Sequence, residues 1–420
     1  MCLDHVPPPS NRLSRRGVLA GAAMLAGVGG AALTTPAAAA QRPAPSRGGD
    51  LVLRGGTLLD PQTGEVTENA TVVITGGAVR AAGADVRVPE GAQVLDVPGK
   101  WVMPGLVDAH MHLTTLDEAG AALRAGVTTV RSGSTSFYQD IALRELAEQA
   151  PELTPRLKAA GVFVTPDLAE TVLADPDLAP LARLHDGVRS PEALRKVVEV
   201  NLRRGADVIK TRVNERAGKP DQDPRTQVYS HEQLAEIVAA ARRGGRGVLC
   251  HSYSEQGCHD AVTAGIRSLE HGVFVGERTL HEMRRRDTYF TPTLTAIAGM
   301  IDSPDPVLAE RGRTYLPILK QAVLAAHATG VPLAAGTDSS GGTVDPVGRE
   351  VELMREAGLP ALDAIRTATT SAARLLGLEK QVGRLRPGYA GDAIVLDADP
   401  LADVSALKTP SLVVRTGVAI

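Results

Sequence analysis

Aromatic residues and cysteines are scarce in this sequence of 420 residues. Phe, Trp and Tyr make up 3% of the chain, so aliphatic side chains must form most of the core. Only two of the three cysteines, Cys250 and Cys258, lie beyond the N-terminal segment, which excludes a disulfide framework and leaves one disulfide open. Cys250 ends an apolar run, and we expect it to pack as a small buried residue. The formal net charge of −3 argues against nucleic acid as a partner.

The first 40 residues have the composition of a targeting segment. Arg15 and Arg16 precede a weakly apolar, glycine-rich run at 18–33, and four alanines follow at 37–40. This pattern resembles a twin-arginine export signal with an Ala-x-Ala cleavage site. A general secretory signal or a membrane anchor is the alternative, but the run is rich in glycine for a spanning helix. We therefore expect export to the periplasm or the extracellular space, and no membrane association of the mature form.

The middle of the chain alternates short apolar strands with helical patterns. Strands are predicted at 102–110, 127–130, 158–164, 207–210, 247–251, 267–271, 288–294 and 332–337. Helices are predicted between most of them, at 116–125, 191–204, 231–243, 255–264, 277–286 and 313–329. Eight β/α units over this length favour an α/β fold of the (β/α)8 TIM barrel type. A doubly wound open sheet is the alternative, although no Gly-x-Gly-x-x-Gly motif follows a first strand.

Both ends of the chain predict short strands separated by turns. Residues 51–54, 71–75, 78–82 and 93–97 are apolar or alternating, and residues 392–397 and 412–415 are similar. Because domain termini often lie close together, we expect these strands to form one small β-sandwich. The predicted organisation is a signal peptide at 1–40, a β-sandwich part at 41–103, the barrel at 104–383 and the second β-sandwich part at 384–420.

Chemically active side chains stand at the ends of the predicted barrel strands. They are His110, His112, Lys210, His251, His271 and Asp338. His110 and His112 are two residues apart on one strand, so their imidazoles point to the same side and can share a metal ion. The carboxyl ends of barrel strands meet at the mouth where active sites lie. Each residue alone could be a satisfied core histidine, a surface lysine or a helix cap, but the coincidence of six favours a metal site.

Several motifs together resemble the amidohydrolase superfamily, in the branch with two metals bridged by a carboxylated lysine. They are PGLVDAHMHL (104–113), AGVTTVR (125–131), GADVIK (205–210), SLEHG (268–272), AAGTDS (334–339) and PGYAGDAIVLDADPL (387–401). The sequence is most similar to the part of this superfamily that contains Xaa-Pro, Xaa-Arg and Xaa-Lys dipeptidases and imidazolonepropionase-like proteins. The resemblance covers nearly the whole chain beyond residue 40.

The resemblance implies two divalent metal ions, with zinc as the first expectation. It places His110, His112 and Asp338 on the more buried ion and His251 and His271 on the other. Lys210 would bridge the two as N6-carboxylysine, because an unmodified ammonium repels a dication whereas a carbamate is an anion with two oxygens. The ions would lower the pKa of a bridging water, and Asp338 would transfer the proton from the resulting hydroxide to the leaving amine.

Departures from the branch concern the residues that would meet the substrate. Lys210 is followed by Thr211 and Arg212 rather than by the two glycines common there. Tyr253 lies two residues beyond His251, on the same side of the strand, and its hydroxyl could donate to the scissile carbonyl oxygen. Arg212 and Arg216 are candidates to hold a substrate carboxylate. Five other histidines, His185, His231, His259, His281 and His327, are expected on the surface or in packing roles.

The sequence therefore predicts an exported metal-dependent amidohydrolase that cleaves an amide bond in a small molecule, either a dipeptide or an N-acyl amino acid. A lactone or carbamate hydrolase is the nearest alternative, because the same hydroxide attacks any activated carbonyl. A mononuclear deaminase is a second alternative, which Lys210 disfavours since a single ion needs no bridge. A non-enzymatic binding protein is the third. The sequence does not decide the substrate, the native metal or whether the chain forms a homo-oligomer.

Overall fold

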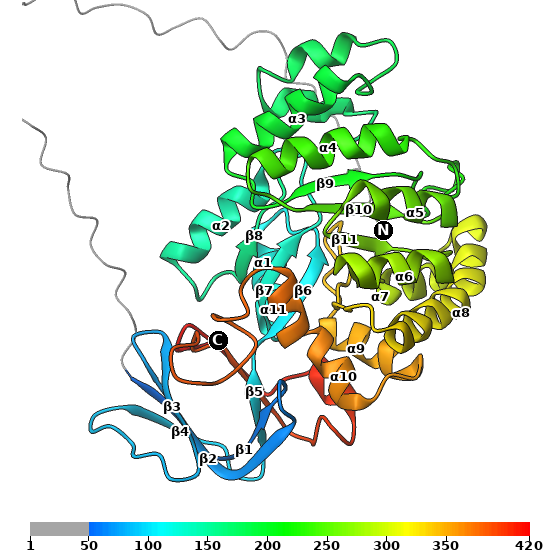
Figure 1. Cartoon of the computed structure of the whole chain (residues 1–420). Helices are drawn as coiled ribbons and strands as arrows, with labels where there is room; N and C mark the ends of the chain where they lie inside the picture. The colour runs from blue at the N-terminus through cyan, green and yellow to red at the C-terminus, as the bar shows by residue number, and fades with distance from the viewer. Residues whose placement is uncertain (1–49) are drawn as a thin grey trace, which may run out of the picture. The chain divides into compact units, whose positions relative to one another are not determined.

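The computed structural model describes residues 50–420. The predicted export signal and cleavage region lie outside these residues and stay predictions. Parallel strands surrounded by helices form the central part of the described chain (Figure 1). Its strands are β6 (Leu106–Met111), β7 (Val127–Ser132), β8 (Arg156–Lys158), β9 (Ile209–Arg212), β10 (Val248–Ser252), β11 (Ser268–His271) and β12 (Tyr289–Thr291). The observed α/β architecture agrees with the sequence prediction.

Hydrogen bonds link these strands into a closed ring. Strands β6, β7 and β8 form one sheet and β9 to β12 another, with every pairing parallel. Between β8 and β9, the amide of Asp207 donates to the carbonyl of Ala159 at 2.7 Å. Residues 332–335 take the eighth position: Leu333 bridges Phe290 of β12, and Ala335 accepts from Ala109 of β6 at 2.8 Å. This closure is the arrangement of a (β/α)8 barrel.

Two of the predicted barrel strands are shorter than their apolar runs. The strand predicted at 158–164 ends at Lys158 and resumes only as an isolated bridge at Val164. The strand predicted at 288–294 ends at Thr291. A helix begins at Leu294 instead, because the buried carboxylate of Glu350 accepts hydrogen bonds from the Leu294 and Thr295 amides. A side chain distant in the sequence thus satisfies the first amides of that helix.

Helices cover the outside of the ring and join its strands. They are α1 (Leu116–Arg124), α2 (Gln139–Gln149), α3 (Pro191–Arg204), α4 (His231–Arg243), α5 (Glu255–Ala264), α6 (Glu277–Arg286), α7 (Leu294–Gly299), α8 (Pro306–Thr329), α9 (Val347–Glu356), α10 (Ala361–Thr367) and α11 (Thr370–Leu375). Short 3-10 helices are η1 (Ala169–Ala174), η2 (Ala179–Arg183), η3 (Met300–Asp302) and η4 (Val404–Lys408). Helices α2, α7 and α9 to α11 are absent from the predicted set.

Local capping explains where several helices begin. In α1, the Thr115 side chain accepts from the Glu118 amide, and the Glu118 side chain accepts from the Thr115 amide. The same reciprocal pair occurs between Ser230 and Gln233 at the start of α4. Helix α8 begins seven residues before the predicted start at 313, because Asp305 caps it ahead of Pro306. Such side chains satisfy amides that have no partner in the first turn of a helix.

The two ends of the described chain share one sheet. Its order is β15 (Val418–Ala419), β14 (Leu412–Arg415), β13 (Ala393–Leu396), β5 (Trp101–Pro104), β1 (Leu51–Asp60), β2 (Glu65–Thr75) and β3 (Ala78–Gly83), with β4 (Gln93–Asp96) also paired to β1. Antiparallel pairing of β13 with β5 joins the C-terminal strands to the N-terminal ones. Residues from both halves, including Leu53 and Val395, share a separate apolar core. As predicted, strands from both ends of the described chain pair with each other. They form one sheet, which has its own apolar core.

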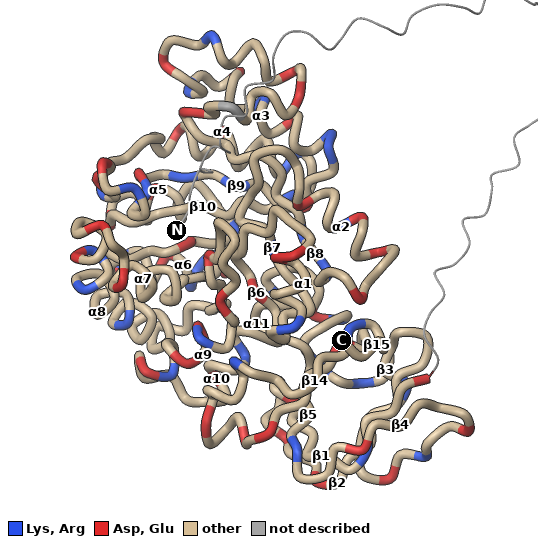
Figure 2. Tube along the Cα trace, turned by 180° about the vertical axis from the view of Figure 1, so that it is seen from behind, with Lys and Arg blue, Asp and Glu red and all other residues tan. Residues whose placement is uncertain are grey.

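Charged residues of both signs are interspersed along the traced chain (Figure 2). Within residues 50–420, no helix has the length and apolar character needed to cross a membrane. Cys250 and Cys258 are both buried and carry free thiols. Burial raises the pKa of the Cys250 thiol to about 12, so this side chain behaves as the small apolar residue that the sequence predicts.

Candidate active site

Four histidine rings follow one another across the carboxyl ends of the barrel strands. The ring centroids of His112 and His110 are 5.5 Å apart, those of His110 and His271 5.3 Å, and those of His271 and His251 4.5 Å. His110 lies on β6, His251 on β10 and His271 on β11. The structure therefore brings together all four histidines that the sequence singles out.

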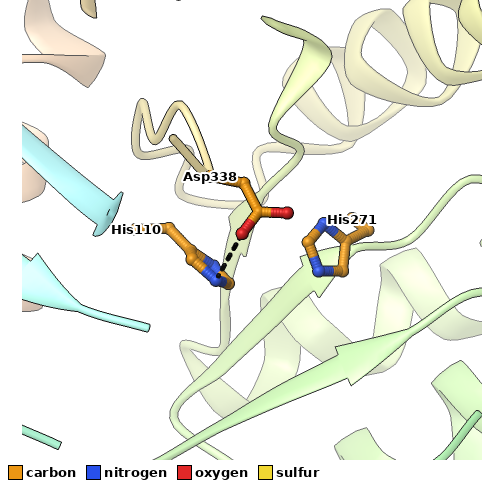
Figure 3. A group of neighbouring side chains, drawn as sticks. All are labelled: His110, His271 and Asp338. Carbon is orange, nitrogen blue, oxygen red and sulfur yellow. Dashed lines mark ion pairs between the residues drawn. The ribbon is translucent and has the colours of Figure 1, made fainter. Parts of the chain in front are cut away.

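Three side chains form the tightest group that could bind a metal ion. Ligand atoms of His110, His271 and Asp338 all lie within 4.8 Å of one another, and all three residues are buried (Figure 3). Oδ1 of Asp338 is 3.4 Å from Nε2 of His110 and 3.1 Å from Nε2 of His112. Two imidazoles and a carboxylate are common ligands of zinc and related divalent ions. The geometry thus fits the predicted metal chemistry.

Lys210 enters the same group from β9. Its Nζ lies 3.0 Å from Nε2 of His110, and the residue is completely buried. The ring of Phe163 lies 5.6 Å from the same nitrogen. No carboxylate within residues 50–420 lies within 4.0 Å of this amine. Lysine is almost never fully buried unless it is paired, so this position is unusual for an unmodified side chain.

His251 and Tyr253 occupy the other side of the cluster. Nε2 of His251 is 3.1 Å from the backbone oxygen of Glu215, which belongs to the loop after β9. The Tyr253 ring stacks on His271 with centroids 5.4 Å apart and an angle of 21° between the planes. Only 2% of Tyr253 is exposed. The predicted strand alternation therefore places Tyr253 beside the histidines.

The two arginines proposed from the sequence as substrate contacts are held by other parts of the protein. Nε of Arg212 donates to Thr165 at 2.8 Å, and its guanidinium pairs with Glu215. The backbone amide of Arg216 donates to Gln222 at 3.0 Å. Because Glu215 already neutralises Arg212, a substrate carboxylate would have to compete with that ion pair.

Glu270 and Arg131 are functional residues that the sequence reasoning missed. Oε2 of Glu270 lies 2.6 Å from Nδ1 of His110, and Nη2 of Arg131 donates to both oxygens of Glu270 at 2.9 and 3.0 Å. Burial by itself raises the pKa of Glu270, but the Arg131 guanidinium and His110 lower it to about 2. The ionised carboxylate fixes the ring of His110 with Nε2 turned towards Asp338 and Lys210. The sequence feature that could have indicated Glu270 is its position directly before His271 in the SLEH strand.

Asp108 is a second residue that the sequence reasoning missed. Its carboxylate accepts from the His110 amide at 2.9 Å and from the Thr337 hydroxyl at 2.8 Å. Burial raises the pKa of Asp108 to about 6, although these hydrogen bonds act in the opposite direction. The contacts fasten β6 to residues 337–338. Asp338 itself adopts a left-handed backbone with a φ of 56°, and its amide donates to the His110 carbonyl at 2.7 Å.

Gly133 leaves room beside the ligand nitrogens. A Cβ atom at this position would lie 2.5 Å from Nε2 of His112 and 2.7 Å from Nε2 of His110. The backbone of Gly133 is not left-handed, so conformation alone does not require glycine there. The absent side chain therefore keeps open the space into which both imidazoles point, as a bound ion requires.

The remaining histidines of the described chain lie away from this cluster. His185 is exposed beside Asp186, and His231 begins α4. His259 contacts Arg278 and Thr279, His281 bonds the Glu277 carbonyl, and His327 pairs with Asp363. These positions agree with the surface and packing roles predicted for them.

Comparison with known proteins gives a consistent picture. The Amidohydrolase family model matches residues 101–419. The ochratoxinase of Aspergillus niger is 27% identical over 406 residues, which cover 85% of this chain and 83% of that protein. A crystal structure of a prolidase complexed with N-methylphosphonate-L-proline is 25% identical, with a TM-score of 0.76 and coverage of 88% of this chain and 99% of the other.

A crystal structure of a Xaa-Pro dipeptidase with bound methionine shares the fold. It has a TM-score of 0.77 at 24% identity and covers 88% of this chain and 99% of that one. The family match spans most of the chain and includes every residue of the histidine cluster. The chain is thus a metal-dependent hydrolase of carbon–nitrogen bonds, and it belongs to the amidohydrolase family.

Proposed function

We propose that this enzyme hydrolyses the amide bond of a dipeptide or an N-acyl amino acid with two divalent metal ions, zinc being the expected one. The observation that carries the proposal is the meeting of four histidines, Lys210 and Asp338 at one end of the barrel. Six ligands are more than one tetrahedral ion needs. A two-ion site accounts for all of them.

Lys210 is proposed to act as a carbamate. Its amine is fully buried next to His110 Nε2 and has no carboxylate partner among the described residues. Reaction of the deprotonated amine with carbon dioxide forms a nitrogen–carbon bond, and the two protons lost from the ammonium go to water. The product is an anionic carbamate, whose two oxygens would help to hold divalent cations. The modification would therefore remove an unfavourable charge and complete both ligand sets.

The remaining steps are assigned to the chain's own side chains. When bound, two metal ions supply Lewis acidity and lower the pKa of water to near neutrality. The Asp338 carboxylate, 3.1 Å from His112 Nε2, is placed to accept a proton and to pass it to the leaving amine. Glu270 holds the tautomer and orientation of His110. Tyr253, stacked on His271, is proposed to donate its hydroxyl to the substrate carbonyl oxygen.

The substrate class is supported by the relatives as well as by the site. A prolidase and a Xaa-Pro dipeptidase share this fold, and ochratoxinase is similar over most of both chains. Small amides are therefore the first compounds to test. Arg212 and Arg216 remain the proposed carboxylate contacts, and Arg212 would have to exchange its ion pair with Glu215 for one with the substrate. A lactone or carbamate remains the alternative substrate for the same residues.

The experiment joins metal content to a substrate screen. Protein produced with supplemented zinc should contain close to two ions per chain and hydrolyse members of a dipeptide and N-acyl amino acid library. Lys210→Ala should lose activity and metal together, and short carboxylic acids should restore part of the activity by replacing the carbamate. Lys196→Ala, at a half-buried position of α3 far from the cluster in the sequence, is the matched control. A fully active protein with one ion, or an active Lys210→Ala variant, contradicts the proposal.

A further inference from the structure

A cavity opens at the amino ends of the barrel strands, opposite the histidine cluster. Its volume is about 270 Å³. The segments that line it precede β9, β10 and β11, and the loop after α11 closes one side. The chemically informative lining residues are Arg131, Lys158, Asp207, Arg246 and Arg267. Four of these five carry a positive charge, although the whole chain has a net charge of −3.

The surrounding ion pairs leave this positive charge only partly compensated. Each nearby carboxylate either lies close to two basic groups or, in the case of Glu270, also contacts His110 of the active site. Asp207 pairs with Arg144 at 2.8 Å and lies 3.9 Å from Lys158. Asp287 pairs with Arg267 at 3.1 Å and with Arg374 at 3.4 Å. Each of these two aspartates therefore neutralises only one of its two basic neighbours. Positive charge remains in excess around the cavity.

The two remaining basic residues of the lining are Arg246 and Arg131. Arg246 is exposed, and within residues 50–420 no carboxylate lies within 4.0 Å of it. Arg131 is 2% exposed and paired with Glu270. Counting the lining groups and the partners named above gives six basic groups and three carboxylates, Asp207, Glu270 and Asp287. Arg144 and Arg374 do not line the cavity, so the excess of three positive charges belongs to the ion-pair network around a cavity of small-molecule size.

We propose that this cavity binds a small dianionic oxyanion, either inorganic phosphate or a phosphate monoester. Guanidinium and ammonium groups on several sides of one cavity match the distribution of charge over phosphate oxygens. A dianion would compensate most of the excess charge, whereas a neutral ligand would leave it in place. Leu375 and Leu376 line the same cavity and offer an apolar wall to the organic part of a monoester. The cavity lies at the other ends of the strands from the histidine cluster. Arg131 contributes to both surroundings, and the proposal does not depend on the proposed substrate.

The test measures anion binding by calorimetry on the metal-loaded full chain. The probes are inorganic phosphate and glycerol 3-phosphate. Lys158→Gln combined with Arg246→Gln removes two lining charges from side chains that are not fully buried, so folding should be retained. Arg203→Gln combined with Arg243→Gln is the matched control, because it removes two exposed positive charges outside the cavity.

The cavity variant should bind phosphate at least about tenfold more weakly than the wild-type protein, since two charge-assisted contacts are lost. The control should bind as the wild type does. Tighter binding of glycerol 3-phosphate than of phosphate would assign the site to monoesters, and the reverse would assign it to the free anion. Equal affinities of the cavity variant and the wild type would place phosphate elsewhere, including at the metal ions, and would overturn the proposal. Failure of both probes to bind the wild-type protein would also overturn it.

Discussion

Nδ1 of His110 lies 2.6 Å from Oε2 of Glu270, although 160 positions separate the two residues in the chain. The contact joins β6 to β11 inside the barrel and leaves Nε2 of His110 for the metal site. Arg131 fixes the carboxylate from the other side. The orientation of His110, a proposed metal ligand, thus depends on the buried Arg131–Glu270 ion pair. Neither member of that pair is proposed to contact the metal or the substrate.

Glu270→Gln should lower metal affinity by about 10- to 100-fold, because a neutral amide holds the His110 ring less firmly than the carboxylate does. Glu310→Gln, on the exposed side of α8, is the control. Competition with a chelator measures the affinity. Circular dichroism must show a folded variant, since Arg131 loses its buried partner. An unchanged affinity in the folded variant would make Glu270 a structural residue only.

Gly133→Ala should reduce metal content sharply without unfolding the protein. The new methyl group would lie 2.5 Å from Nε2 of His112 and would occupy the space that the ion needs. Gly299→Ala is a suitable control, because Gly299 has a helical φ of −63° and a Cβ there meets no atom within 4 Å. Elemental analysis gives the result. Full metal content in Gly133→Ala would show that the imidazoles can move aside or that the ion binds elsewhere.

Tyr253→Phe should lower kcat by roughly two to three orders of magnitude if the hydroxyl stabilises charge on the substrate carbonyl oxygen. Metal content should stay unchanged, because the ring still stacks on His271. Tyr389→Phe removes a hydroxyl that bonds the Glu379 carbonyl and serves as the control. Steady-state kinetics separate the outcomes. A change in KM alone would indicate that Tyr253 binds substrate. No change in kcat or KM would indicate that it only packs.

Glu350 should make stability decrease as the pH rises from about 5 to 8. Burial raises its pKa to about 7, although the amides of Leu294 and Thr295 favour the ionised form. The folded pKa is above the unfolded one, so the stabilisation is complete below about pH 4.5 and is lost through about pH 7. A fully buried group with this shift contributes roughly 3 kcal/mol to the pH dependence.

Denaturant unfolding of the metal-free protein and of Glu350→Gln at several pH values measures this contribution. The free-energy difference between wild type and variant should change in favour of the variant over that range. Glu352→Gln, on the same helix and partly exposed, should not show the effect. Parallel pH profiles of wild type and Glu350→Gln would mean that the two amides and the Thr295 hydroxyl, which also donates to Glu350, keep this carboxylate ionised at low pH.

Export by the twin-arginine route is proposed from the sequence alone. Replacing Arg15 and Arg16 together with lysine should leave the precursor in the cytoplasm, because the arginine pair is the recognised feature. Replacing Arg12 with lysine is the control for a change outside the pair. Fractionation followed by immunoblotting measures the distribution. Normal export of the double variant would favour the general secretory route.

Local patterns in the sequence predict most of the barrel strands and single out six side chains that the structure brings together. Alternation with period two predicts that His110 and His112 point to one side and that Tyr253 lies beside His251, although β6 ends at Met111 and β10 at Ser252. Apolar runs followed by polar residues mark the carboxyl ends of β9, β10 and β11. These features are local, so a single sequence contains them. The family motifs add the ligand roles, which spacing alone does not provide.

Long-range contacts decide the rest. Only the closed barrel brings Glu270 to His110, Asp108 to Thr337 and Glu350 to the first amides of α7. These pairs are 160, 229 and 56 positions apart, and no periodicity links their members. The cavity at the amino ends of the strands is likewise visible only when Lys158 and Arg246 come together. The sequence by itself determined which chemically active residues follow the predicted strands, because that pattern involves only neighbouring residues. Tertiary structure decided the orientation and charge of the site because those depend on buried partners from distant strands.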